Sequence, residues 1–530
     1  MIKSSQSVQD ILNIYPEYRS FLFNRGYIIS NEPFTNNDEF PLYGNFILSE
    51  LRGYYFAVHK NQHFYYFEDN KMAVFLIGNC VNPFSKVLDE ETIIQNLINK
   101  GDVNSSSWFD YINELTGDFL LGYIFNDKLF FLTDPAGMLF CAYGTINGRL
   151  FLSSHAQLVC DIVPLHKSEY IKQLEKYKYF YKYGVFFPGD LTQFVELKRA
   201  LQNHIMSYDG MSFSYKRFFP TQELKECVSD FEYQEIISKT MEILSSTMSL
   251  ISDKYQNSAI SMTGGMDSKT TLAAAVDKYD KFFLYSYITM FGDERDAVAA
   301  HEIAKHIGVN HSIINISEND SDFKNINIVR EILQHNNGNY KLNDNDVRKR
   351  AFFAENHLFD IEVKSWVSEI ARSNYYKKFG LKKMPKHLSA RNMTSMYKIF
   401  LWQRHLANKT NKVFARFIKK TGFHNLPNGY DESDMYLWEF RYSAWGGMVI
   451  TSEHSYSNEI FIPFNNRKLL EIMLRAPKKK RINDQFHHDL ISFGNKKISE
   501  TGITITNWNE TKKRMKIERL YFLLNSILPF

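Results

Sequence analysis

The 530-residue chain has 63 lysine and arginine residues and 59 aspartate and glutamate residues, which leaves a formal net charge of only +4. Such a small excess does not support bulk binding to nucleic acid, because that function requires a concentrated basic face. Hydrophobic residues make up 44% of the chain and charged residues 23%, which is the balance of a globular protein, and the length predicts two or three domains.

The cysteines and the N-terminal sequence bear on the cellular setting. Four cysteines, at positions 80, 141, 160 and 227, are scattered without the spacing of metal ligands, and we expect reduced, mostly buried thiols. The first residues lack the apolar core of a signal peptide, and no apolar run reaches the roughly 18 residues of a membrane span. The expectation is therefore a cytoplasmic protein without a membrane span.

The N-terminal part of the chain predicts an α+β region. Residues 1–35 have apolar positions at roughly helical spacing and predict a short helical lead-in. Short aromatic and β-branched runs then predict antiparallel strands at 53–60, 63–69, 72–79, 117–127, 128–134, 138–144 and 149–155, with a helix at 89–101. Such sheets must bury their apolar faces against each other or against helices. Strand density fades near 205–235, which predicts a linker.

The next part of the sequence predicts parallel strands. Strands and helices alternate, with strands at 258–262, 282–290 and 312–316 and helices at 268–279 and 296–308. A βαβαβ run of this kind forms parallel strands with right-handed crossovers. The rest of the chain is predicted to be mostly helical.

The most informative segment is Ser261-Met262-Thr263-Gly264-Gly265-Met266-Asp267-Ser268-Lys269, between the first of these strands and its helix. Backbone N–H groups and the helix dipole at such a turn can hold phosphate groups. Two glycines let the backbone approach an anion closely, the hydroxyls add donors, and Asp267 can hold Mg²⁺ against phosphate oxygens. The GxxxxGK[ST] pattern of a Walker A loop does not occur at this turn.

This segment resembles the SGGxDS pyrophosphate loop of the asparagine synthetase family, with Thr263 in place of the first serine. Four other segments resemble that family in the family's order: 117–144, 183–210, 294–311 and 463–477. The resemblance implies an α+β, Ntn-hydrolase-like sandwich followed by an α/β ATP-pyrophosphatase domain with a HUP-like parallel sheet and a helical C-terminal part. It divides the chain into a helical extension (1–42), a degenerate glutaminase-like domain (43–215) and the ATP-pyrophosphatase domain (216–530).

The resemblance also implies a reaction. The family uses ATP and Mg²⁺ to adenylate a carboxylate, releasing pyrophosphate, and an amine then displaces AMP to form an amide. Asp267 is implied as a catalytic metal ligand, and the residues implied to contact the nucleotide are Ser261, Thr263, Gly264, Gly265, Asp267, Ser268 and Lys269.

Three departures from the family pattern qualify this expectation. A glutaminase of the family needs an N-terminal cysteine, but position 2 is Ile and the first cysteine is Cys80, so we expect no glutamine hydrolysis. At the second metal motif Ser368 stands where the family has Asp. Glu369 could replace it as a metal ligand, or Ser368 and Glu369 could be a helix cap; Arg372 could contact phosphate or substrate, or pair with an acid.

The third departure is a missing lysine after the proline of the 463–477 segment. The stretch 481–491 offers Arg481, His487 and His488 instead, and Lys269 is the alternative cation, unless it is simply solvated. Glu439, in the segment Trp438-Glu439-Phe440-Arg441-Tyr442, could be a general base for the incoming amine. Its alternative role is a structural carboxylate–guanidinium pair.

The expected function is an ATP-dependent amide ligase that does not hydrolyse glutamine, similar to β-lactam synthetase and the lasso-peptide cyclases. Its partners would be a small-molecule, peptide or glycan carboxylate and an amine, and a homodimer is left open. The alternatives are a non-catalytic descendant that binds a nucleotide or a partner protein, and an ammonia-using asparagine synthetase.

Overall fold

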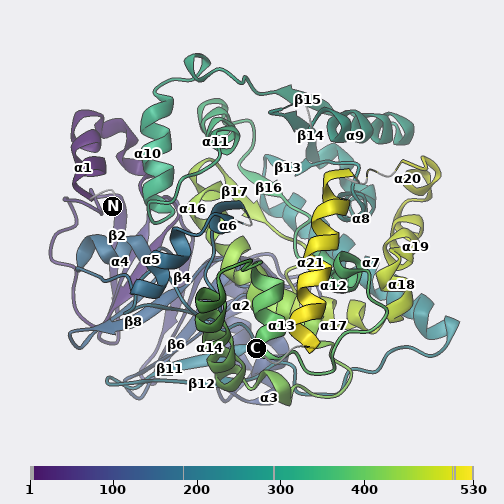
Figure 1. Ribbon diagram of the computed structural model, residues 1–530. Coiled ribbons are helices and arrows are strands. Elements are labelled where there is room, and N and C mark those ends of the chain that lie inside the picture. Colours follow the sequence, from purple (N-terminus) through teal and green to yellow (C-terminus); the bar gives the residue numbers. More distant parts are fainter. Residues whose placement is uncertain (1–4, 183, 291–292, 504, 506–508, 528–530) are drawn as a thin grey trace.

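The computed structural model describes residues 5–182, 184–290, 293–503, 505 and 509–527 (Figure 1). At the N-terminus, helix α1 (Ser5–Ile14) buries Val8 and Leu12, but the predicted helical lead-in ends early, and Tyr27–Ser30 forms strand β1. All four residues of β1 are buried. A strand this short, buried on both faces, has no alternating pattern that the sequence could reveal.

Strand β1 lies inside the first of two six-stranded antiparallel sheets. The order in this sheet is β10 (Lys198–Arg199), β8 (Ala142–Ile146), β9 (Arg149–Ser153), β1, β3 (Tyr54–His59) and β2 (Phe46–Leu51). The strand predicted at 138–144 begins only at Ala142, because the Asp134 carboxylate accepts the backbone N–H groups of Met138 and Leu139 and holds that stretch as a turn.

The second sheet packs against the first. Its order is β12 (Phe213–Arg217), β11 (His204–Tyr208), β7 (Lys128–Thr133), β6 (Thr116–Phe125), β5 (Met72–Val81) and β4 (Phe64–Glu68). Phe56 of the first sheet meets Phe75 of the second edge to face, with ring centroids 5.0 Å apart, so the two apolar faces share one core. The helices of this half are α2 (Glu90–Asn99), α3 (Ser106–Ile112), α4 (Ala156–Ile162), α5 (Glu169–Glu175) and α6 (Tyr179–Lys182).

The predicted linker at 205–235 is wrong in its first half. Strands β11 and β12 pair as a hairpin in which His204 lies opposite Arg217, although the polar sequence between them lacks a strong strand pattern. Helix α7 (Asp230–Lys254) then begins with a capping box, in which Ser229 and Glu232 satisfy each other's backbone N–H groups. The two sheets therefore include residues on both sides of the expected boundaries at 42 and 215, and the division into domains stays a prediction.

The parallel sheet predicted for the second half is present, with five strands. Their order is β15 (Ser312–Asn315), β14 (Phe282–Ile288), β13 (Ser258–Ser261), β16 (Ile361–Val363) and β17 (Glu459–Phe461), and all four pairings are parallel. From β13 the chain adds strands first on one side and later on the other. The order therefore reverses between β13 and β16, which is where open α/β sheets bind ligands.

Helices make up most of the remaining chain, as predicted, and α21 runs beside α12 and α13 (yellow in Figure 1). In the described part of the chain, no helix has both the length and the apolar sequence that crossing a membrane requires. The bounds are α8 (Met266–Ala274), α9 (Glu294–Ile307), α10 (Ile326–Asn336), α11 (Asp344–Asn356), α12 (Asn374–Phe379), α13 (Ala390–Tyr397), α14 (Arg404–Thr421), α15 (Glu432–Tyr436), a π-helix (Leu437–Gly447), α16 (Met448–Ser452), α17 (Arg467–Leu474), α18 (Lys478–Ile482), α19 (Gln485–Gly494), α20 (Lys496–Glu500) and α21 (Asn509–Ile527).

Candidate active site

A cavity of about 360 Å³ opens at the carboxyl edge of the parallel sheet. The segments that follow β13, β14 and β16 meet there, because the carboxyl ends of parallel strands lie at one edge. The cavity brings together five of the residues predicted for the nucleotide site and Glu369. Its lining residues are Ser261, Met262, Thr263, Gly265, Asp267, Ser268, Ser286, Tyr287, Asp293, Asp296, Ala297, Lys364, Ser365, Trp366 and Glu369.

The glycine turn after β13 presents its backbone N–H groups to oxygen atoms of the protein itself. Gly264 N–H donates to a carboxylate oxygen of Asp296 at 3.3 Å, Gly265 N–H to the Thr263 hydroxyl at 3.2 Å, and Thr263 N–H to the Ser268 hydroxyl at 3.0 Å. Burial raises the pKa of Asp296, and the bond from Gly264 opposes that rise. The turn is therefore a set of donors to which an anionic oxygen is already bound.

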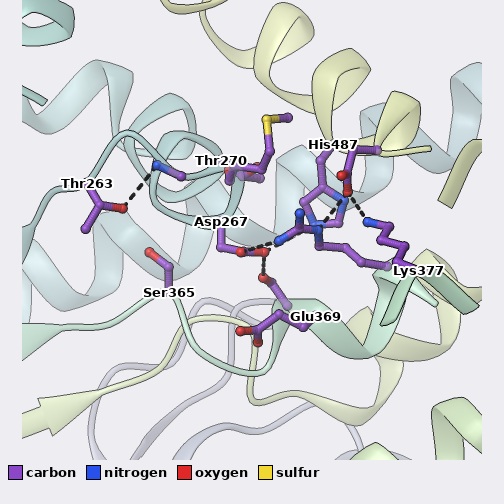
Figure 2. A network of polar contacts seen from close by, with 12 residues as sticks. Thr263, Asp267, Thr270, Ser365, Glu369, Lys377 and His487 are labelled. Atoms are coloured by element: carbon purple, nitrogen blue, oxygen red, sulfur yellow. Dashed lines mark hydrogen bonds and ion pairs between the residues drawn. The ribbon is translucent and has the colours of Figure 1, made fainter. Parts of the chain in front are cut away.

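Asp267, in the first turn of α8, lies at the centre of a polar network (Figure 2). The Ser368 hydroxyl donates to one of its carboxylate oxygens. Arg372 donates to the other, with Nη1 2.5 Å from Oδ2. Ser368 thus lies beside Asp267, at the second metal motif, and its hydroxyl bonds Asp267 instead of capping a helix. The N-cap residue of this 3₁₀ turn is Val367, which makes no side-chain hydrogen bond. The helix-cap alternative is therefore wrong for Ser368, whereas Glu369 lies in the first turn of this 3₁₀ helix and its carboxylate accepts a backbone N–H.

Glu369 lies beside Asp267 and lines the same cavity. Burial, followed by the nearby Asp267 carboxylate, raises the pKa of Glu369 to about 8. The Tyr442 hydroxyl, from the π-helix, donates to it. Val367, two residues earlier, is fully buried with φ +77°, a strained conformation for a β-branched residue. The strained residue lies directly before Ser368, which bonds Asp267, and Glu369, whose pKa the Asp267 carboxylate raises.

Arg372 joins Asp267 to a second carboxylate. Its Nε lies 2.8 Å from Asp484 Oδ1, and Lys377 also donates to Asp484. The two carboxylates raise the pKa of Arg372 further despite its burial. Arg372 is therefore an ion-pair partner of Asp267 in this structure, the alternative that the sequence left open. Arg372 is not among the residues that line the cavity and is connected to it through Asp267.

His487 faces the same carboxylate from α19 (Figure 2). Its side chain is fully buried, and Nε2 lies 3.9 Å from Asp267 Oδ1. Within the described structure, neither ring nitrogen has a hydrogen-bond partner. Burial lowers the pKa of His487 to about 3, so the ring is neutral. Of the three residues offered in place of the family's lysine, Arg481 is excluded, because its guanidinium pairs with Asp434 at 2.8 Å.

Two predicted site residues lie elsewhere. The Lys269 ammonium donates to the Ile503 carbonyl at 2.7 Å and is not among the residues that line the cavity, because side chains two positions apart on a helix, such as Asp267 and Lys269, diverge. Glu439 accepts two bonds from Arg217, at 2.5 and 2.9 Å, and one from Asn203 at 3.0 Å. The structural ion pair is thus present, with Arg217 and not Arg441 as the partner. The π-helix gives Tyr442, not Glu439, to the site.

Sequence reasoning missed several residues of the site. Asp293 and Asp296 flank the start of α9 and lie in or next to the segment 294–311, so the acidic residues there were the signal that could have identified them. Tyr442, Lys377 and Asp484 lie far from the loop in sequence, and their local sequence carries no phosphate-site pattern. They are found only because the fold brings their elements to Asp267.

Comparisons with known proteins add little at this site. No protein-family model and no curated protein matches the sequence. The chain is similar to glutamine phosphoribosylpyrophosphate amidotransferase from B. subtilis complexed with ADP and GMP (8% identity, TM-score 0.22, 57% of this chain and 62% of that one). It is also similar to a structure described as the allosteric regulatory enzyme of purine biosynthesis (11%, 0.23, 58% and 62%).

A third similar structure is glutamine-dependent NAD⁺ synthetase from Acinetobacter baumannii in complex with ADP (13% identity, TM-score 0.21, 48% of this chain and 60% of that one). The chain thus spans 60–62% of the length of these three proteins. TM-scores this low carry no argument about fold or function. The function must therefore be inferred from the geometry of the site.

Proposed function

We propose that the chain is an ATP-dependent ligase that adenylates a substrate carboxylate, releases pyrophosphate and passes the acyl group to an amine, without hydrolysing glutamine. The observation that carries this proposal is the donor-rich turn at 263–265, located where the strand order of the parallel sheet reverses. A nucleotide phosphate bound there would replace the Asp296 carboxylate at Gly264 N–H and lie at the N-terminus of α8.

The acidic residues of the cavity fit a magnesium ion held together with phosphate. Mg²⁺ in nucleotide sites is bound by one or two carboxylates, with phosphate oxygens and water completing its ligands. Asp267 and Glu369 are the two carboxylates, and Glu369 is close enough to Asp267 for its pKa to rise. A cluster of three or more acidic, histidine or cysteine ligands is not found among the described residues, so an ion held by protein alone is not supported. When bound, Mg²⁺ would neutralise the charge of the departing pyrophosphate.

The residues around Asp267 would then exchange partners. As the carboxylate of the substrate attacks the α-phosphorus and the bond to pyrophosphate breaks, negative charge moves onto the pyrophosphate. Arg372, freed from Asp267, could turn its guanidinium to that charge while Asp484 keeps its Nε in place. His487 has two unused ring nitrogens 3.9 Å or more from Asp267 and could donate to the same oxygens.

An adjoining cavity of about 540 Å³ offers a place for the carboxylate and the amine. The two cavities share Tyr287, Lys364 and Trp366. The second also contains the carboxyl group of Glu453, whose pKa burial raises to about 8, and its deprotonated form could act as a general base toward the amine at pH values near 8 and above. Trp366 stacks on Trp445, with ring centroids 5.1 Å apart, and the pair forms one wall of this cavity.

The environment of the four cysteines supports the proposal that the chain does not hydrolyse glutamine. That reaction needs a reactive thiolate, and Cys80, Cys141 and Cys227 are buried while Cys160 is half-buried. Burial raises the pKa of all four thiols, which makes each a poorer nucleophile. The amine would therefore come from the substrate or from free ammonia.

One observation favours a non-catalytic nucleotide-binding descendant. Asp267 is already neutralised by Arg372 and bonded to Ser368, so a metal ion must displace an ion pair to reach it. Incubation with ATP, Mg²⁺ and small molecules that co-purify with the protein, identified by mass spectrometry, separates the two functions. Pyrophosphate release that depends on one of these compounds supports the ligase; ATP binding without pyrophosphate release from any of them supports the descendant.

A further inference from the structure

A third cavity, of about 340 Å³, lies away from the nucleotide site and shares no lining residue with it. It is formed where the start of α5 and the segment 191–198 meet α14. Two side-chain contacts hold these parts together: the hydroxyls of Tyr170 and Thr410 at 2.8 Å, and Lys409 with Gln173 at 3.3 Å. Its volume is at the lower end of the range of about 300–1,000 Å³ that small-molecule sites occupy.

Four basic side chains line this cavity, and none of the described residues that line it is acidic. Lys409, Lys412 and Arg416 follow one another along one face of α14, at intervals of three and four residues. Lys198 faces them from β10, and its pKa is lowered by burial and by the nearby charges of Lys420 and Arg416. An anion bound here would offset the repulsion that Lys420 and Arg416 exert on the Lys198 ammonium.

The two carboxylates that act on the Lys198 ammonium already have other partners. Asp190 and Glu196 both act on the Lys198 ammonium. Asp190, however, is paired with Lys420 at 2.7 Å, and Glu196 accepts a bond from His166 at 2.8 Å. The positive charge of the cavity is therefore not balanced by these two carboxylates.

The rest of the lining is apolar. Tyr170, Ile171, Leu191, Phe194 and Val413 form the wall. Val195 is half-exposed at 50% and lies at the same cavity. Lys412 and Arg416 are exposed to solvent beside this apolar wall, so the cavity offers cations and apolar surface together. The two features together select a ligand that has both an anionic and an apolar part.

We propose that this cavity binds an amphipathic anion: a small molecule with a phosphate or carboxylate head group on an aliphatic or aromatic body. Arg416 and Lys412 receive the head group, since guanidinium and ammonium groups bind phosphate and carboxylate oxygens through charge-assisted hydrogen bonds. The body lies against the apolar wall. The site does not depend on the ligase activity, because it shares no residue with the nucleotide cavity.

The test uses four probes with the full-length protein, measured by isothermal titration calorimetry below the micelle concentration. Octyl phosphate and octanoate carry both parts of the ligand, octanol lacks the charge, and inorganic phosphate lacks the body. We expect the first two to bind about tenfold or more tightly than the last two, and the better head group to be identified by comparing them. Affinity for octyl phosphate and octanoate no greater than for inorganic phosphate and octanol, or no binding of either amphipathic probe, overturns the proposal.

Variants on one helix locate the site. Lys412→Glu should weaken octyl phosphate binding by about tenfold or more, since it removes one charge-assisted contact and adds repulsion. Lys419→Glu makes the same charge change seven residues further along α14, outside the cavity, and should leave binding unchanged. Equal effects of the two substitutions would reduce the site to a diffuse basic surface and overturn it. Val195→Ser should weaken octyl phosphate but not inorganic phosphate, and matching melting curves confirm that all three variants are folded.

Discussion

The guanidinium of Arg372 lies 2.5 Å from the carboxylate of Asp267, across 105 residues of sequence. Asp484 holds the other side of the same guanidinium. The negative charge of Asp267, the candidate metal ligand of the phosphate loop, is thus balanced by Arg372, and Arg372 has Asp484 as a second partner. Because Asp484 can retain Arg372 when Asp267 turns to a metal ion, the pair can open without leaving an unpaired buried charge.

Replacement of Asp267 by Ala should abolish activity without unfolding the protein. We expect pyrophosphate formation to fall about a hundredfold or more, because the carboxylate anchors the ion that stabilises the leaving group. Arg372 keeps its bond to Asp484, so the melting temperature should change little. Asp277→Ala, an exposed residue after the same helix, is the matched control in a pyrophosphate assay. Near-normal activity of Asp267→Ala would refute the metal assignment.

Replacement of Glu369 by Gln should change how Mg-ATP binding depends on pH. The pKa of Glu369 is raised to about 8, so the group is mostly protonated in the free protein at pH 7 and must lose its proton to bind a metal. Mg-ATP affinity of the wild type should therefore rise as pH increases from about 6 to 8, while Glu369→Gln binds about tenfold more weakly and without this pH dependence. Titrations of both proteins with Mg-ATP at several pH values between 6 and 8 measure this affinity.

The same residue makes a separate prediction about stability. Its folded pKa lies above the unfolded value near 4.3, so between about pH 4.3 and 8 the folded state holds the extra proton, and the stability that this provides is lost as pH rises toward 8. Glu369→Gln should remove this loss, so its melting temperature should fall less than that of the wild type between pH 6 and 8. If the melting temperatures of the two proteins fall by the same amount between pH 6 and 8, the raised pKa of Glu369 is contradicted. Glu302→Gln, exposed on α9, is the control for both experiments.

Replacement of His487 by Leu should leave the free protein at least as stable and yet reduce pyrophosphate formation. A buried ring with two unpaired nitrogens costs stability, by about 1–3 kcal/mol for an unsatisfied polar group, and leucine removes that cost. If the ring donates to the nucleotide phosphates, activity should fall by about tenfold or more. His306→Leu, which changes an exposed histidine near the end of α9, should leave activity unchanged. If the His487→Leu variant is less stable but fully active, His487 has a structural role and does not contact the nucleotide.

Replacement of Glu439 by Leu should act on stability and not on chemistry. Its carboxylate is 2% exposed and bonds Arg217 twice, and removal of one partner from a buried pair costs about 3–5 kcal/mol. The double variant with Arg217→Leu should recover part of this loss. Denaturant unfolding measures the change, and the folded fraction should keep its normal rate of pyrophosphate release. A rate that falls in the folded fraction would restore Glu439 as a general base.

Glutamine should not serve as a nitrogen donor. Incubation with glutamine, ATP and an acceptor should yield no glutamate, because the four thiols are buried or half-buried and their pKa values are raised. Cys80→Ser should release pyrophosphate at the wild-type rate. Glutamate formed in proportion to the amide product would show that the N-terminal sheets retain a glutaminase.

Local sequence determined the elements that place the phosphate loop. Apolar runs with a glycine turn between them predicted β13, α8, β14, α9 and β15, and all five form with parallel strands. These features depend on residues close together in the chain, where periodicity and turn chemistry act directly. Asp267, which the sequence predicted as a metal ligand, lines the cavity at this turn, and its role toward a metal stays a prediction.

The family resemblance named Ser368, Arg372 and His487 as candidates for the site, but only the tertiary structure decided that they lie around Asp267. Arg372, Ser368 and His487 come from a 3₁₀ turn and from α19, more than a hundred residues away, and no local pattern states which groups a fold will bring together. The sequence likewise did not determine the direction in which a side chain points. Lys269 and Glu439 have the right chemistry for a site, but Lys269 bonds the Ile503 carbonyl and Glu439 pairs with Arg217. Periodicity gives the spacing of faces along one helix, whereas packing against distant elements decides which face meets the site.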